Sequence, residues 1–127
     1  MKHDAQYFFD KLSAIPEERW NSGSFQDVDY HTGFETRCVF GLLGVNTTDC
    51  RLEGEALEFA RLFGEVSDDH LESFKFFRCP GYHLAVSINN NPYGFLGHSH
   101  GYDQETPRQR ILAALTDIIA KEVPIAT

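Results

Sequence analysis

Cys38 is the residue whose type and setting most directly suggest covalent chemistry. It opens an apolar run, residues 38–44, for which we favour a short helix with Gly44 as its C-terminal cap over the alternative of a buried strand. A thiol at a helix N-terminus, with Arg37 beside it, has a lowered pKa and a larger thiolate fraction. Cys38 is therefore a candidate nucleophile. The alternative is a small buried hydrophobic residue within an apolar heptapeptide.

A cysteine nucleophile of the papain-like kind needs a histidine base and an amide that orients the base. The histidines that could serve are His83, His98 and His100, and the amides are Asn89, Asn90 and Asn91. We nominate His98 as the base and Asn89 as the orienting amide. No local signature of a known cysteine hydrolase surrounds the thiol, so the hypothesis depends on the fold bringing these residues together.

His98 and His100 also form a candidate metal-binding pair. Alternate residues of an extended segment point the same way, so both imidazoles could bind one metal ion. The third ligand would come from Asp103, His83 or Cys79. Two histidines are an incomplete set, and the alternative is a solvated loop. We predict no bound cofactor.

Acidic residues dominate the charge of the chain. Nineteen Asp and Glu oppose eleven Lys and Arg, giving a formal net charge of −8. This balance would repel phosphate backbones and anionic membranes, so we expect neither direct nucleic-acid binding nor membrane association. The segment 49–72 concentrates the acids, either as a solvated face or as a patch for a basic partner. The predicted binding residues are Glu55, Glu58, Asp68 and Asp69 there, and Asn90, Tyr93 and His100 in the loop 89–105.

Helical periodicity and end signals predict the main elements. Asp4 can cap a first helix, Pro16 begins a short turn that ends at Trp20, and an apolar stripe runs along residues 53–63. Thr106 and Pro107 open the last helix with a capping box. Trp20 is expected in the core, and Gly41 is expected to permit close packing.

Alternating residues over 82–88 predict a strand with small side chains on its second face. The following segment, 89–105, shows neither helical nor strand pattern, and a connection of this length is usually functional or disordered. We therefore expect a single α+β domain over residues 1–127. About four helices would pack on a small, mainly antiparallel sheet, with the strand 82–88 at its centre.

The order of several short motifs resembles an uncharacterised family of small proteins encoded by bacteriophages, plasmids and bacteria. Those proteins share a Trp, Cys-x-x-Gly, Ile-Asn-Asp and Thr-Pro-x-x-Arg pattern. The matching stretches here begin at Trp20, Cys38, Ile88 and Thr106, and the resemblance covers about residues 5–119. Asn90 stands where the pattern has Asp, which weakens any role that requires a carboxylate there. The resemblance implies a cytosolic, mobile-element context and no particular chemistry.

These observations favour a small acidic protein-binding module. The three cysteines include no C-x-x-C pair, and the N-terminal residues lack a signal-peptide pattern, so we expect a cytoplasmic protein with reduced thiols. Its partner would be a basic protein, for instance a nucleic-acid-handling host factor. A cysteine-dependent enzyme and a histidine metal site are the alternatives, and a homodimer is a further expectation because Phe is abundant.

Overall fold

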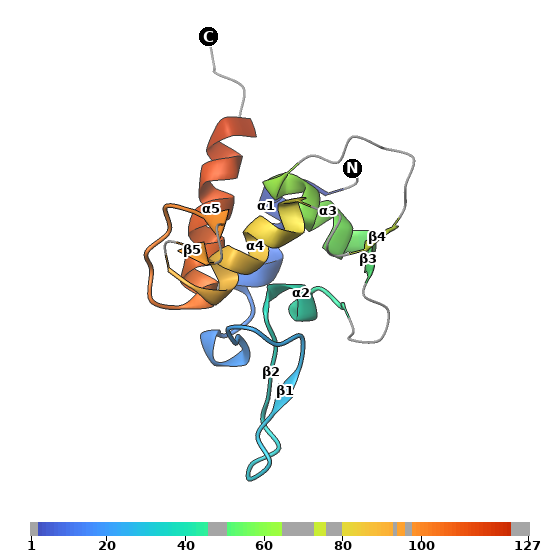
Figure 1. Ribbon diagram of the computed structural model, residues 1–127, viewed down its shortest axis with the longest axis vertical. Coiled ribbons are helices and arrows are strands. Elements are labelled where there is room, and N and C mark those ends of the chain that lie inside the picture. Colours follow the sequence, from blue (N-terminus) through green and yellow to red (C-terminus); the bar gives the residue numbers. More distant parts are fainter. Residues whose placement is uncertain are drawn as a thin grey trace.

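Helix α1 (Ala5–Ser13) packs along helix α5 (Pro107–Glu122), so segments far apart in the sequence lie side by side (Figure 1). The protein is described from a computed structural model that covers residues 3–45, 51–64, 73–75, 80–92, 94–95 and 98–122. The other helical elements are η1 (Glu17–Arg19), α2 (Val39–Leu42), α3 (Gly54–Phe63) and α4 (Pro80–Asn90).

The strands are short and pair in antiparallel fashion. In the described residues they form three two-stranded sheets: β1 (Asp27–Val28) with β2 (Glu35–Thr36), β3 (Arg51–Glu53) with β4 (Ser73–Lys75), and β5 (Gly94–Phe95) with β6 (His98–Ser99). One compact α+β domain with four longer helices results, which confirms the predicted fold class. Within the same part of the chain, no helix has the length and apolar character of a membrane span.

The predicted helix starts are confirmed by their capping hydrogen bonds. The Asp4 carboxylate accepts a hydrogen bond from the Tyr7 backbone N–H at 2.9 Å. The Thr106 hydroxyl oxygen accepts one from the Gln109 N–H at 3.2 Å. Each side chain satisfies a backbone donor that the first turn of a helix leaves without a partner. Local sequence therefore fixes where α1 and α5 begin.

The core is built around three phenylalanines from different helices. The Phe59 ring lies 5.4 Å from the Phe8 ring and 5.6 Å from the Phe40 ring, centroid to centroid, and both pairs meet edge to face. All three side chains are fully buried. Edge-to-face contacts add specific geometry to apolar burial, so these rings fix how α1, α2 and α3 meet. Trp20 is also buried, as predicted.

The predicted central strand over residues 82–88 is wrong, because this segment belongs to helix α4. Gly81, Ala85 and Ile88 are buried, and their spacing places them on one side of a helix. A Cβ atom on Gly81 would lie 1.9 Å from the carbonyl oxygen of Ala60 in α3. The small residues, which suggested the second face of a strand, instead let α3 and α4 approach closely. Packing thus overrides the β propensity of Val86 and Ile88.

The predicted patternless segment 89–105 is also partly wrong. Its first two residues complete α4, and its middle contains the β5–β6 pair. Helix α2 agrees better with expectation. It ends at Leu42 with Leu43 as its C-cap residue, and Gly44, the next residue, has a φ of +94° and donates its N–H to the Gly41 carbonyl at 3.1 Å. Gly41 does permit close packing. A Cβ there would lie 2.0 Å from the Phe25 carbonyl oxygen.

Candidate functional site

Cys38 lies at the N-cap of α2 and is 5% exposed. Burial raises the pKa of its thiol, and the nearby backbone N–H groups of Gly41 and Phe40 offset only part of that rise. The predicted lowering of this pKa is therefore wrong in direction. A helix of four residues provides little dipole to stabilise a thiolate, and the apolar surroundings disfavour the charged form.

Cys38 should resist alkylation in the folded protein. In a Cys50→Ser, Cys79→Ser background, we expect iodoacetamide to label Cys38 at neutral pH only as fast as the protein unfolds, because the thiol is both buried and protonated. The measurement is the labelling rate against pH and against urea. A labelling half-point well below about 8.5, the ordinary cysteine value, would instead support a nucleophile.

The Asn89 amide hydrogen bonds to the backbone of the residue that follows Cys38 and to two further groups of the chain. Its Oδ1 accepts a hydrogen bond from the Val39 N–H at 3.1 Å, and its Nδ2 donates to the Asn21 carbonyl at 3.0 Å. Nδ2 also donates to the Asn90 Oδ1 at 2.9 Å. Asn89 is fully buried. The Asn89 amide thus connects α4 to the start of α2 and to the chain after Trp20.

His98, the predicted base, lies in β6, and its side chain is outside the described residues. His83 lies on α4, where its ring meets the Tyr82 ring edge to face, with centroids 5.5 Å apart. The catalytic assignment of Cys38, His98 and Asn89 stays a prediction.

Sequence reasoning missed the role of Arg110, which is 2% exposed. Its Nε donates to the Ile88 carbonyl at 2.7 Å, and its Nη2 donates to the Asn89 carbonyl at 2.8 Å. Its Nη1 donates to the Gln104 carbonyl at 2.7 Å. Burial lowers the pKa of Arg110. The guanidinium therefore caps the C-terminal end of α4, where unpaired carbonyls and the helix dipole favour a positive charge.

The stretches that begin at Trp20, Cys38, Ile88 and Thr106 meet in one buried polar cluster. Asn21 follows Trp20, Val39 follows Cys38, and Asn89 hydrogen bonds to both of them. Arg110, from the Thr-Pro-x-x-Arg stretch, binds the carbonyls of Ile88 and Asn89. Each of these hydrogen bonds links a side chain of one segment to the backbone of another, so the cluster stabilises the fold.

No protein-family model matches this chain, and no curated protein and no solved structure matches it either.

The ring of His100, a predicted metal and binding residue, is engaged on both nitrogens. Its Nδ1 accepts a hydrogen bond from the Tyr102 N–H at 3.2 Å, so Nε2 carries the proton that faces the Asn91 carbonyl at 2.8 Å. This arrangement leaves no ring lone pair for a metal. Among the residues that the structure describes, no group of three or more potential ligands is close enough to hold a metal ion.

Glu55 and Glu58, predicted to bind a partner, are used within the chain. Glu55 accepts hydrogen bonds from the Tyr7 hydroxyl and the Lys11 ammonium, both at 2.5 Å, and these contacts lower its pKa. Glu58 accepts from the His3 backbone N–H at 3.2 Å. Both carboxylates thus tie α3 to the N-terminal segment. The other predicted acids, Asp68 and Asp69, and also Tyr93, lie outside the described residues.

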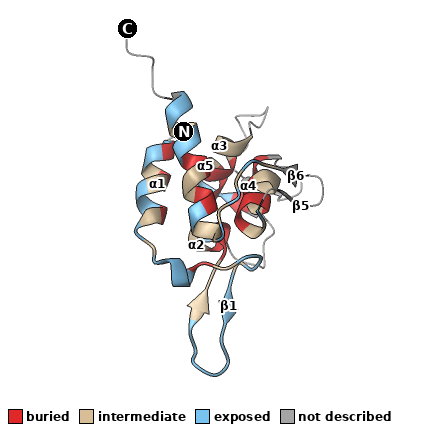
Figure 2. Ribbon diagram, turned by 90° about the vertical axis from the view of Figure 1, so that its left-hand side faces the viewer, coloured by how far each residue is buried: buried red, intermediate tan, exposed pale blue. Residues whose placement is uncertain are grey.

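The hairpin formed by β1 and β2 is the most exposed feature of the described chain. It projects from the helical body in Figures 1 and 2. The large apolar side chains exposed in the described residues are Val28 at 41%, Tyr30 at 100% and Phe34 at 39%, and all three lie on this hairpin. The sequence analysis assigned no binding role to these three residues. Their apolar character would ordinarily predict burial, so the sequence did not indicate that they are exposed.

Hydrogen bonds fix the turn that carries Tyr30. The Asp29 carboxylate accepts from the N–H groups of His31 at 2.8 Å and Thr32 at 3.2 Å, and its carbonyl accepts from the Gly33 N–H at 2.7 Å. Gly33 has a φ of +74°, which glycine adopts without strain. Aspartate commonly stabilises turns in this way. The exposed tyrosine is therefore held on a preformed loop.

The base of the hairpin is equally well anchored. The Asn21 N–H donates to the Arg37 carbonyl at 2.9 Å, and the Arg37 N–H donates to the Arg19 carbonyl at 2.9 Å. The Arg19 guanidinium lies 4.4 Å from the centre of the Phe34 ring, a cation–π contact. These contacts connect the hairpin to the same residues that meet the Asn89 amide, so its orientation is set by the core.

Proposed function

We propose that this protein acts by binding another protein through the β1–β2 hairpin. The observation that carries the proposal is the position of Tyr30, which is fully exposed at the tip of a hydrogen-bonded turn, with Val28 and Phe34 exposed beside it. An exposed apolar cluster on a projecting element costs solubility and contributes nothing to the core. Aromatic side chains of this kind are the usual anchors of protein interfaces.

Charge indicates the chemistry of the partner. Residues 27–36 contain three carboxylates and neither lysine nor arginine. Glu35 is ion-paired with Arg37, so the unbalanced negative charge of the hairpin lies on Asp27 and Asp29. The whole chain has a formal net charge of −8. The partner is therefore a protein with a basic surface and an apolar pocket that receives Tyr30. Like charges would reject an acidic partner, and opposite charges would speed association.

Nucleic-acid-handling proteins fit this description, since their lysine and arginine surfaces bind phosphate. The proposal includes a cytoplasmic, phage- or mobile-element-borne setting, in which a host factor such as a defence effector would be the target. The fixed turn supports tight recognition, because a preformed loop loses little conformational entropy when it binds. The sequence analysis predicted Glu55 and Glu58 as binding residues. We now propose the hairpin as the binding surface instead, because both carboxylates already accept hydrogen bonds within the chain.

Site-specific photo-crosslinking in cells tests the hairpin directly. We expect p-benzoylphenylalanine at position 30 to give a discrete adduct with a basic protein. The same probe at the exposed position 120 should give none, because this position is near the C-terminal end of α5, the end that lies away from the hairpin in Figure 1. Excess wild-type protein should compete the adduct away, and the Tyr30→Ala variant should not. Binding should weaken as ionic strength rises, because steering between exposed charges is screened.

Two outcomes would contradict the proposal. Equal labelling from positions 30 and 120 would mean that the hairpin has no special role in recognition. An adduct of the chain with a second copy of itself would replace the basic partner by the predicted homodimer, and sedimentation at several protein concentrations would then establish its stoichiometry.

A further inference from the structure

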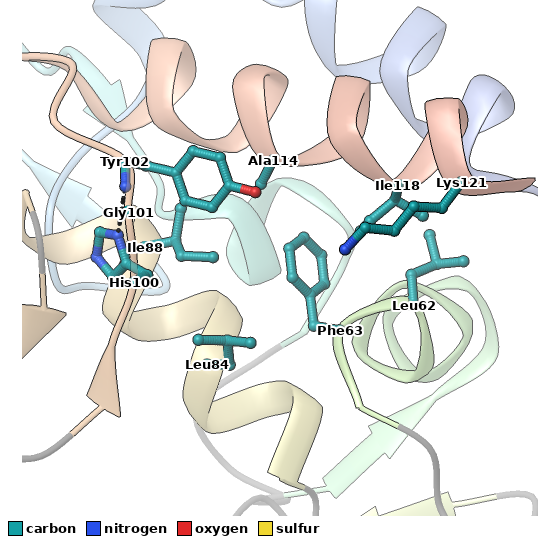
Figure 3. A pocket seen from close by; sticks show the side chains of 10 residues that line it. All are labelled: Leu62, Phe63, Leu84, Ile88, His100, Gly101, Tyr102, Ala114, Ile118 and Lys121. Carbon is teal, nitrogen blue, oxygen red and sulfur yellow. Dashed lines mark hydrogen bonds between the residues drawn. The ribbon is translucent and has the colours of Figure 1, made fainter.

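A pocket of about 310 Å³ opens between helices α3, α4 and α5 (Figure 3). All three helices contribute apolar side chains to its wall, and polar groups complete the lining. The apolar residues are Leu62, Phe63, Leu84, Ile88, Ala114 and Ile118. None of its lining residues belongs to the hairpin, so this site is separate from the proposed protein interface. The volume lies at the lower end of small-molecule sites, which are typically apolar with a few placed polar groups.

One end of the pocket has polar groups that already bind each other. The His100 ring is engaged by Asn91 and by the Tyr102 N–H, and the latter contact is drawn in Figure 3. The Tyr102 hydroxyl donates to the Asp117 carboxylate at 2.8 Å, and burial together with this contact raises the pKa of Tyr102 to about 12. A neutral phenol beside a carboxylate disfavours an anionic group at this end.

Lys121 lines the other end and supplies the charged group of the pocket wall. Its ammonium is directed toward the pocket in Figure 3, on the side of Phe63 and Leu62. Among the described residues, no carboxylate forms an ion pair with it. The Lys121 ammonium lies at one end of the pocket and the Asp117 carboxylate lies near the other. A ligand with one charged end would therefore bind in a single orientation.

We propose that this pocket binds an amphipathic monocarboxylate with a short aliphatic tail. The tail lies among Phe63, Leu84 and Ile118, where it leaves water for an apolar wall. The carboxylate meets the Lys121 ammonium, and the Asp117 end excludes the reverse orientation. The positive charge of Lys121 favours a carboxylate over an amine as the ligand's head group. The small volume of the pocket excludes a long-chain lipid.

Amide NMR titration of the full chain with three probes tests the site. Octanoate, 1-octanol and octylamine share one tail and differ in head-group charge. We expect octanoate to shift the amides of residues that line the pocket and to bind more tightly than the alcohol, with the amine weakest. Lys121→Met keeps an apolar stem and removes the ammonium, so octanoate should bind about five- to tenfold more weakly while 1-octanol is unaffected. Lys121 is exposed, so this variant should fold normally.

Ile118→Trp fills the pocket and should abolish binding of both octanoate and 1-octanol. Ile119→Trp is the matched control, since Ile119 has similar partial exposure and does not line the pocket. The proposal is overturned if octanoate leaves the pocket amides unmoved, if octylamine binds as tightly as octanoate, or if Lys121→Met changes nothing. Shifts confined to the hairpin amides would overturn it as well.

Discussion

Arg110→Met should lower the free energy of unfolding by about 3–5 kcal/mol, because it removes a buried guanidinium and leaves three carbonyl oxygens without donors. Methionine has a similar stem and fills much of the same space, so the loss reports hydrogen bonding more than packing. Urea unfolding followed by circular dichroism measures it, with the midpoint as readout.

Two comparison variants identify the cause of that loss. Gln109→Met changes the neighbouring residue, which is exposed, and should alter stability by less than about 0.5 kcal/mol. Arg110→Lys keeps the charge but cannot direct three donors at fixed angles, so it should fall between wild type and Arg110→Met. If Arg110→Met were as stable as the Gln109 control, the cap on α4 would contribute nothing.

Gly41→Ala should destabilise the protein by about 1–3 kcal/mol, although alanine is ordinarily the better helix former by about 1 kcal/mol. The added Cβ would lie 2.0 Å from the Phe25 carbonyl oxygen and 2.8 Å from its carbon, so backbone has to move. The same movement would disturb the chain that leads into the hairpin. The unfolding midpoint again serves as the measurement.

Gly101→Ala is the control for this change. A Cβ there meets nothing within 4 Å, and its backbone does not require glycine. We expect it to leave the unfolding midpoint unchanged. If Gly41→Ala were as stable as Gly101→Ala, the backbone at Phe25 would be able to move away at little cost. The close approach of Gly41 to the Phe25 carbonyl would then not be a requirement of the fold.

Sequence predicted the parts of this fold that depend on nearby residues. The caps at Asp4 and Thr106, the end of α2 at Gly44 and the amphipathic helix α3 each follow from interactions within a few positions, and all were found. Residues 82–88 were misassigned because period-two and helical patterns overlap when small and apolar residues alternate. Only the close contact of Gly81 with Ala60 decides between them, and that contact joins different helices.

The candidate sites were harder to predict for the same reason. Nothing in a single sequence shows that Arg110 will be buried against carbonyls, since arginine is ordinarily exposed. Nothing local shows that Glu55 will bind Tyr7 and Lys11, which lie more than forty residues earlier. Exposure of Tyr30 depends on how far the hairpin extends beyond the body. Long-range contacts decide which side chains remain available to a ligand.

The packing of α1 against α5 has a consequence for the order of events during synthesis. A growing chain that ends before α5 already contains Phe8, Leu12 and Ile88, but lacks the helix that covers them and Arg110, which completes the polar cluster. Contacts between such distant segments form late and slow folding. A nascent chain of this protein therefore exposes apolar surface until α5 has been made, and chaperones or proteases would meet it in that interval.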